Sequence, residues 1–214
     1  RRHLDNLVEP HAVTFQAQWN AWLRAKYETT ERLRQAWDGG SKPLGDELLR
    51  NGDFTGSLSG TWTMERDAKT RVEYDVLDNG PAGSRIFRID VQQQGEESWR
   101  PQLSQSGFAV KADEPYTVTC WLRGEAAASV GLNCKMAHDP WQHLGFSTDV
   151  SIGSEWKEFR FTFVASQDDD QARLTVTNLK PGVYELAAFS LRPGGIVGLP
   201  DGLRLEDGTV PVLK

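Results

Sequence analysis

The sequence has few cysteines, no long apolar run and no long run of charges of one sign. Two cysteines in 214 residues are too few for a disulfide-rich scaffold or for a zinc site of the usual ligand spacing. No apolar segment approaches the roughly 18 residues that a membrane-spanning helix needs. We therefore expect no membrane partner, no bound metal and a fold held together by an ordinary hydrophobic core.

The charge balance is mildly acidic. The chain has 24 Lys and Arg residues against 30 Asp and Glu residues, which gives a net charge of −6. A surface that binds nucleic acid needs a basic patch or stripe, and the sequence contains none. We therefore expect no nucleic-acid partner.

The first ten residues, RRHLDNLVEP, include neither an initiator methionine nor an apolar signal region. Such a start is typical of an excised or processed piece of a longer protein.

Motifs of the common enzyme classes are also missing. The sequence has no phosphate-binding loop, no nucleophile elbow and no cysteine and histidine signature. A glycosidase needs two carboxyl groups facing each other, and no pair stands out among the 30 acidic residues. His138 and His143 lack a fixed helical face and an obvious third ligand, so they do not indicate a metal site. We expect no catalytic activity from this chain alone.

The hydrophobic pattern changes once along the chain. Between residues 13 and 37, apolar side chains recur every three or four positions, which predicts a hairpin of two short helices. From about residue 48, short alternating segments lie between Gly, Asp, Asn and Pro turns, which predicts a mostly β chain folded as a β-sandwich. The predicted strands cover residues 61–66, 71–77, 85–92, 99–105, 107–111, 115–123, 129–136, 156–164, 171–178 and 183–191. The Gly and Pro content of the tail, residues 194–214, predicts an extended linker or the re-entry into another domain.

Residues 116–136 predict two strands joined by a turn at residues 124–128. If these strands pair, Cys120 faces Cys134, either as a cross-strand disulfide or as two small core residues. The polar faces would then form one surface with Trp121, Arg123, Asn133 and Lys135.

Five landmarks carry a family resemblance. They are the run Leu49-Arg50-Asn51-Gly52-Asp53-Phe54, Trp62, the segment WRPQLSQ at 99–105, the strand YTVTCWLRG and the segment EWKEF at 155–159. In order and spacing they resemble the carbohydrate-binding modules of families 4, 9 and 22. The resemblance implies a jelly-roll β-sandwich that binds polysaccharide without catalysis and is secreted or attached to the cell envelope.

The same families often hold a structural calcium ion. Its acidic ligands follow the Asn-Gly-x-Phe turn and lie in the last strand, where this sequence has Thr55 and either Ala187 or Ala188. Without anionic oxygens a calcium site loses much of its attraction, so we expect no cofactor here.

The N-terminal segment WNAWLRAKYETTERLRQAWDGG is similar to a helical segment of some glycoside hydrolase (β/α)-barrels. The tail RLEDGTVPVL could be the same barrel resuming. The resemblance implies a covalently linked catalytic domain as partner. It divides the chain into residues 1–46, from a hydrolase domain, the module at 47–193, and the tail at 194–214.

A flat aromatic side chain can stack on the apolar face of a sugar ring while polar neighbours bond the hydroxyl groups. Trp99, Trp121 and Trp141 are the candidate platforms. Each has a structural alternative: Trp99 in the core beside Leu103, Trp121 under a loop or helix, and Trp141 as a loop anchor. The candidate hydroxyl partners are Arg88, Arg100, Gln102, Arg123, Asn133 and Lys135, any of which could instead be an ordinary solvated or paired charge.

Two other functions stay open from the sequence. The sandwich could brace a catalytic barrel without binding sugar, or it could be a jelly-roll hydrolase or lyase.

Overall fold

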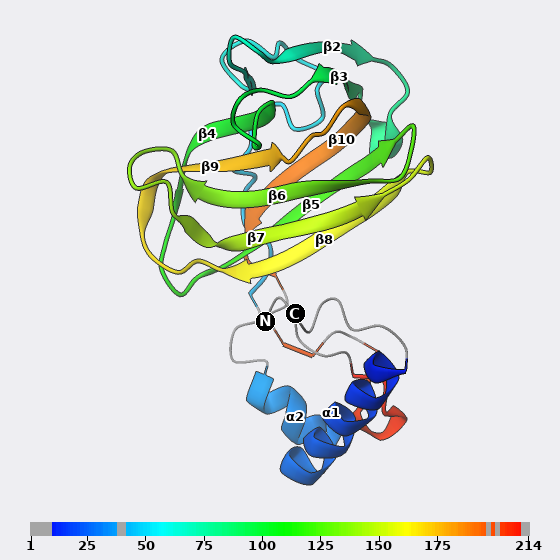
Figure 1. Ribbon diagram of the computed structural model, residues 1–214. Helices are drawn as coiled ribbons and strands as arrows, with labels where there is room; N and C mark the ends of the chain where they lie inside the picture. The colour runs from blue at the N-terminus through cyan, green and yellow to red at the C-terminus, as the bar shows by residue number, and fades with distance from the viewer. Residues whose placement is uncertain (1–9, 38–41, 196–197, 200–201, 211–214) are drawn as a thin grey trace. The chain divides into compact units, whose positions relative to one another are not determined.

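The computed structural model describes residues 10–37, 42–195, 198–199 and 202–210. The chain packs as two compact units (Figure 1). The larger unit is Pro43–Gly195, and the smaller unit combines Arg1–Lys42 with Ile196–Lys214. The larger unit therefore interrupts the smaller one in the sequence.

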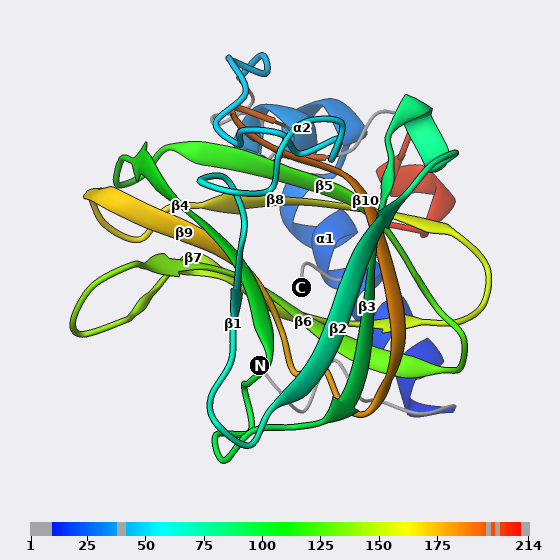
Figure 2. The ribbon, with the colours of Figure 1, turned by 90° about the horizontal axis from the view of Figure 1, so that it is seen from above.

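Two antiparallel five-stranded sheets form the larger unit (Figure 2). The first sheet has the strand order β1-β4-β9-β6-β7, and the second has the order β2-β3-β10-β5-β8. The strands are β1 (Thr63–Glu65), β2 (Arg71–Leu77), β3 (Ile86–Gln93), β4 (Gln102–Val110), β5 (Pro115–Gly124), β6 (Ala128–Met136), β7 (His143–Ile152), β8 (Lys157–Val164), β9 (Asp169–Thr177) and β10 (Gly182–Pro193). The predicted mostly β sandwich is confirmed.

The core lies between the sheets and follows the alternation of the sequence. In β3, Phe87, Ile89 and Val91 are at most 1% exposed, because every second side chain of the strand points to the other sheet. Cys120 and Cys134 are both buried in this core and carry free thiols. Burial raises the pKa of the Cys134 thiol to about 12, so the thiol stays protonated at neutral pH.

The predicted pairing of the strands at 115–123 and 129–136 is wrong. Strand β5 lies between β10 and β8 in the second sheet, whereas β6 lies between β9 and β7 in the first. The chain crosses from one sheet to the other at the turn, so the apolar faces of the two strands meet across the core. As a result, Trp121 and Arg123 lie on the opposite side of the sandwich from Asn133 and Lys135.

Two further strand predictions differ from the structure. The segments predicted at 99–105 and 107–111 form one strand, β4, which has bulges beside Phe108. Strand β7 was not predicted, although Leu144, Phe146, Val150 and Ile152 are buried at alternate or near-alternate positions. The intervening Gly, Ser and Asp residues are exposed and made this edge strand look like a loop.

The smaller unit contains α1 (His11–Tyr27), α2 (Thr30–Trp37) and a short 3-10 turn, η3 (Leu205–Asp207). Its small core brings together the helices and the last described segment, and consists of Leu23, Leu33, Leu199, Leu205 and Val210. The Asn20 side chain donates to the Val210 carbonyl and accepts from the Val210 N–H, both at 3.0 Å. Among the described residues, no helix is long and apolar enough to cross a membrane.

Candidate functional site

The outer face of the first sheet carries an ordered array of polar side chains. We call it the β4–β9–β6 face, after its three central strands. Its middle row contains hydroxyl and amide groups, one from each strand, which stand directly opposite one another. From β1 to β7 the row consists of Thr63, Ser104, Thr175, Asn133 and Ser147.

Several of these side chains are almost inaccessible although they point away from the core. Gln102 is 1% exposed, Ser104 6%, Asn133 7% and Thr175 0%. Each lies beside a core residue in its strand, as Gln102 and Ser104 flank Leu103, and therefore faces outward. Polar groups shielded on an outer face by their own neighbours are uncommon and indicate a specialised surface.

Glu65 joins the edge of this face to its centre. One carboxylate oxygen of Glu65 accepts from Gln102 Nε2 at 2.7 Å. The other accepts from Ser104 Oγ at 2.6 Å and from Arg173 Nη1 at 2.9 Å. These contacts fix three side chains from β4 and β9 in one arrangement, because charge-assisted hydrogen bonds are short and directional.

Two buried polar atoms of this network have no hydrogen-bond partner within the part of the chain that the structure describes. They are Oε1 of Gln102 and Nε of Arg173. A buried polar atom without a partner costs about 1–3 kcal/mol, so native proteins rarely leave one in place without a use for it. Both atoms lie beneath the surface of the face and are held in place by the remaining contacts of their side chains.

Trp141 stands above one end of the array. It is 49% exposed, and the Arg173 guanidinium carbon lies 4.9 Å from the centroid of its ring. The backbone of Trp141 has a φ of 60°, which is strained for a bulky side chain. Its N–H donates to the His138 carbonyl at 2.8 Å. The large Trp141 ring is therefore half exposed to solvent, and its backbone is strained.

The loop below Trp141 is fastened to β9. His138 Nε2 lies 3.0 Å from Oδ2 of Asp169, whose side chain is 1% exposed. The His138 ring contacts the Asp139 backbone carbonyl and the Asp169 carboxylate. Both contacts raise the pKa of His138, the first of them most.

Trp99 and Arg100 precede β4 and lie beside the end of β9. The Arg100 guanidinium carbon is 4.5 Å from the Trp99 ring centroid, and the Trp99 carbonyl accepts from Thr177 Oγ1 at 3.1 Å. Trp99 is half-buried and is not part of the sandwich core, so it does not pack beside Leu103 there.

The end of the face nearest Trp141 is basic. Arg173 stands opposite Lys135, and Lys135 stands opposite His143. Desolvation lowers the pKa of Lys135, and the Arg173 charge lowers it further. Desolvation and the Lys135 charge likewise lower the pKa of His143.

The outer face of the second sheet is different, and we call it the β3–β10–β5 face. Charges of alternating sign stand opposite one another across four strands, in the order Asp75, Arg88, Glu185 and Arg123. Glu185 accepts from Arg123 Nε at 2.5 Å and lies 3.8 Å from Arg88. Arg123 also covers the Trp156 ring at 4.7 Å. Trp121 is half-buried on the same face, opposite Glu158.

The predicted site residues are thus divided between two faces. Trp99, Arg100, Gln102, Asn133, Lys135 and Trp141 belong to the first sheet or its loops, whereas Arg88, Trp121 and Arg123 belong to the second. The sequence prediction omitted several members of the array, namely Glu65, Ser104, Ser147, Arg173 and Thr175. Strand β9 itself was predicted at 171–178, and the alternation of Arg173, Thr175 and Thr177 with the buried Leu174 and Val176 was the signal that could have selected Arg173 and Thr175.

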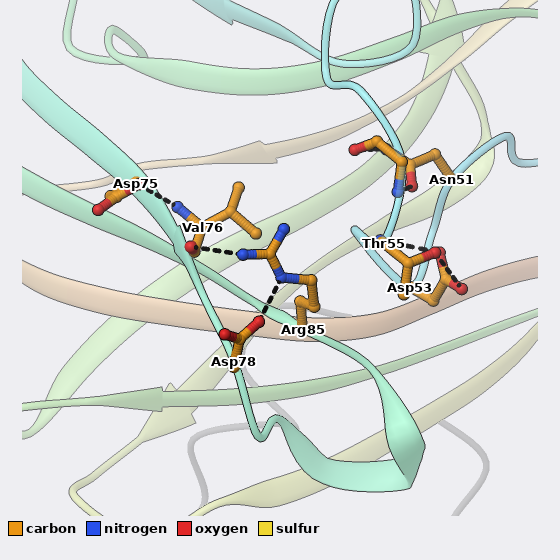
Figure 3. Close-up of polar contacts among 8 residues, drawn as sticks. Asn51, Asp53, Thr55, Asp75, Val76, Asp78 and Arg85 are labelled. Atoms are coloured by element: carbon orange, nitrogen blue, oxygen red, sulfur yellow. Dashed lines mark hydrogen bonds and ion pairs between the residues drawn. The ribbon is translucent and has the colours of Figure 1, made fainter.

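The Asn-Gly-Asp-Phe turn has a structural role. A Cβ atom at Gly52 would lie 2.0 Å from the Phe189 carbonyl oxygen, so only glycine fits against β10 there. Figure 3 shows the Asp53 carboxylate turned to the Thr55 hydroxyl, 2.9 Å away, and Arg85 donating to Asp78.

This region does not fit the calcium site of the resembled families. Thr55, Ala187 and Ala188 offer no carboxylate, and within the described residues no group of three or more His, Cys, Asp or Glu is arranged to hold a metal.

Solved structures with similar folds include several sugar-binding modules. A CBM4 module is 17% identical, with a TM-score of 0.57, and the match covers 68% of this chain and 99% of that one. The xylan-binding domain CBM22-1 of Paenibacillus barcinonensis Xyn10C is 14% identical, with a TM-score of 0.51 and coverage of 72% and 98%. The enzymatically active domain of bacteriophage CBA120 tailspike protein 4 is 11% identical, with a TM-score of 0.50 and coverage of 69% and 21%. At these identities the likeness establishes the fold alone.

The sequence itself decides the family. No curated protein is significantly similar to the chain. The family model described as carbohydrate binding domain matches residues 46–181, which is more than half of the chain and covers all strands from β1 to β9. The chain therefore belongs to this family of carbohydrate-binding modules, whose role is to bind sugar without catalysis.

Proposed function

We propose that the β4–β9–β6 face binds a polysaccharide and that Trp141 stacks on one of its sugar rings. The observation that carries the proposal is the outer face of shielded polar groups, in which, among the described residues, Gln102 Oε1 and Arg173 Nε have no hydrogen-bond partner. A sugar hydroxyl can both donate and accept, so it suits an amide oxygen and a guanidinium N–H alike.

The middle row adds a second reason. Its hydroxyl and amide groups offer donors and acceptors across the whole width of the sheet, from Thr63 to Ser147. Asn133 is held in place by Ser147, which donates to its Oδ1 at 2.7 Å. Side chains that are already ordered lose little conformational entropy on binding, which favours affinity for a ligand as polar as a glycan.

The aromatic platform supplies the remaining part of the contact. Arg173 lies against one side of the Trp141 ring, and half of the Trp141 side chain faces solvent. A sugar ring on the open side would cover apolar surface on both partners.

The module would serve a secreted or cell-envelope glycoside hydrolase to which it is covalently joined. This part of the proposal is supported by the hydrolase-like helical segment and by the smaller unit, in which that segment packs with the end of the chain. Holding the enzyme on its polysaccharide would raise the local substrate concentration.

Affinity electrophoresis of the full chain in gels with soluble β-glucan, xylan, mannan or a uronic acid polymer tests the proposal. We expect at least one polymer to retard the protein. Trp141→Ala should weaken that binding about tenfold or more, because an aromatic contact contributes about 0.5–1.5 kcal/mol beyond the area it buries.

Trp121→Ala is the matched control, since it removes the same side chain from the opposite face. It should leave retardation unchanged. Equal loss in both variants, or loss only in Trp121→Ala, would contradict the assignment to this face. A chain that no polymer retards would favour a bracing module, and turnover of any polymer by the purified chain would favour an enzyme.

A further inference from the structure

A row of basic side chains crosses the β4–β9–β6 face next to Trp141. Arg173 of β9, Lys135 of β6 and His143 of β7 stand opposite one another on three neighbouring strands. Each points outward, because Leu144, Cys134 and the other alternate residues fill the core. The row is perpendicular to the strands and parallel to the neutral middle row.

The positive charge of this row is only partly balanced, because Glu65 is the carboxylate that acts on both Arg173 and Lys135. Glu65 pairs with Arg173 at 2.9 Å, and Asp169 pairs with His138 at 3.0 Å. Among the described residues, no carboxylate forms an ion pair with Lys135, and Arg173 retains an unpartnered Nε. Protein surfaces usually pair neighbouring like charges with opposite ones, as the β3–β10–β5 face does with Arg88, Glu185 and Arg123.

We propose that Lys135 and Arg173 bind an acidic group of the glycan, a uronic acid carboxylate or a sulfate ester, whose sugar ring stacks on Trp141. This inference rests on the proposed function and specifies its ligand class. An anion there would accept from the Arg173 guanidinium group and from the Lys135 ammonium group, and would take the place of water bound to them. The neutral middle row would hold the hydroxyl groups of the adjoining sugars.

The test compares polymers that differ only in charge. Calorimetry would measure the affinity of the full chain for glucuronoxylan, alginate and polygalacturonate, each beside its carboxyl-reduced form, and for dextran sulfate beside dextran. We expect at least one acidic form to bind about tenfold more tightly than its neutral counterpart, with a preference that declines as salt is added. The pair that shows the preference identifies the anion as carboxylate or sulfate.

Two variants on the face should change the preference in opposite directions. Lys135→Met should abolish the preference for the acidic form, because it removes the ammonium group that binds the anion. Glu65→Gln should increase it, because Arg173 would lose its carboxylate partner. Lys157→Met, which removes the same charge from β8 in the second sheet, is the control and should retain the full preference.

Two results would overturn the inference: equal affinity for the acidic and neutral form in every pair, or the same loss of preference in Lys157→Met as in Lys135→Met. If the neutral forms bind and Trp141→Ala removes that binding, the proposed function survives without an acidic ligand. If no polymer binds in either form, both proposals fail together.

Discussion

The two outer faces of the sandwich are built from the same residue types, but the hydrogen bonds and ion pairs of their side chains differ. On the β3–β10–β5 face, Arg88, Glu185 and Arg123 neutralise one another, and a tryptophan ring covers the last of these. On the β4–β9–β6 face, a single carboxylate, Glu65, holds Gln102, Ser104 and Arg173 in place. Within the described parts of the chain, Gln102 Oε1 and Arg173 Nε of this network have no hydrogen-bond partner.

This difference is the reason for proposing the ligand site on the β4–β9–β6 face and not on the β3–β10–β5 face. Both faces have tryptophans and both have arginines, so counting such residues cannot distinguish them. The hydrogen bonds that the protein leaves unmade do distinguish them, because a folded chain normally satisfies its buried polar groups internally.

The largest expected effect is the difference in stability loss when the central arginine of each face is replaced. Arg173→Met would leave Glu65, 24% exposed, without its partner and should lower the free energy of unfolding by about 2–3 kcal/mol. Arg88→Met should cost less than about 1 kcal/mol, because Arg88 is 37% exposed and Glu185 keeps Arg123. Urea denaturation measures both. Similar losses would show that the two networks are equally exposed to solvent screening.

A smaller effect is expected from one hydroxyl group. Thr175→Val keeps the shape of a side chain that is 0% exposed in the middle row. It should weaken glycan binding about three- to tenfold, since it removes the hydroxyl group that orients Asn133, and a hydrogen bond contributes about 0.5–1.5 kcal/mol. Thr119→Val on β5 makes the same change on the opposite face and should not alter affinity. Titration calorimetry with the polymer that wild type binds would detect the difference. Identical affinities of wild type and Thr175→Val would show that the middle row does not take part in glycan binding.

The smallest effect concerns the loop that carries Trp141. The pKa of His138 is raised in the folded chain, so its contacts with the Asp139 carbonyl and the Asp169 carboxylate add stability below the ordinary histidine pKa. That contribution is lost as the pH rises through the folded-state pKa. Melting temperatures at pH 5.5 and pH 8 should therefore differ slightly more in wild type than in His138→Gln. A larger difference in the variant would contradict this role.

Alternation along single strands was enough to predict which side chains enter the core. Phe87, Ile89, Val91 and Leu174 are buried at the alternate positions of predicted strands, whereas Arg173 beside Leu174 faces outward. These predictions succeed because the side-chain period of a strand is a local property of the backbone.

The partners of each strand could not be predicted in the same way. A symmetrical turn between β5 and β6 suggested a hairpin, but the chain crosses to the other sheet there. The contacts that decide this come from β9 and β10, which lie more than thirty residues later in the sequence. For this reason Trp121 and Asn133 were predicted on one surface, and Thr175 and Glu65 were not selected.

The larger unit begins and ends at neighbouring points of its own fold. The Gly45 N–H donates to the Pro193 carbonyl at 2.8 Å, and the Leu48 N–H donates to the Leu191 carbonyl at 2.9 Å. For the smaller unit, a folded sandwich therefore acts as a short connection rather than a loop of about 150 residues. By the logarithmic law for loop closure, this saves roughly 3 kcal/mol of chain entropy. Unfolding of the sandwich would therefore lower the stability of the smaller unit, in which α1, α2 and η3 pack together.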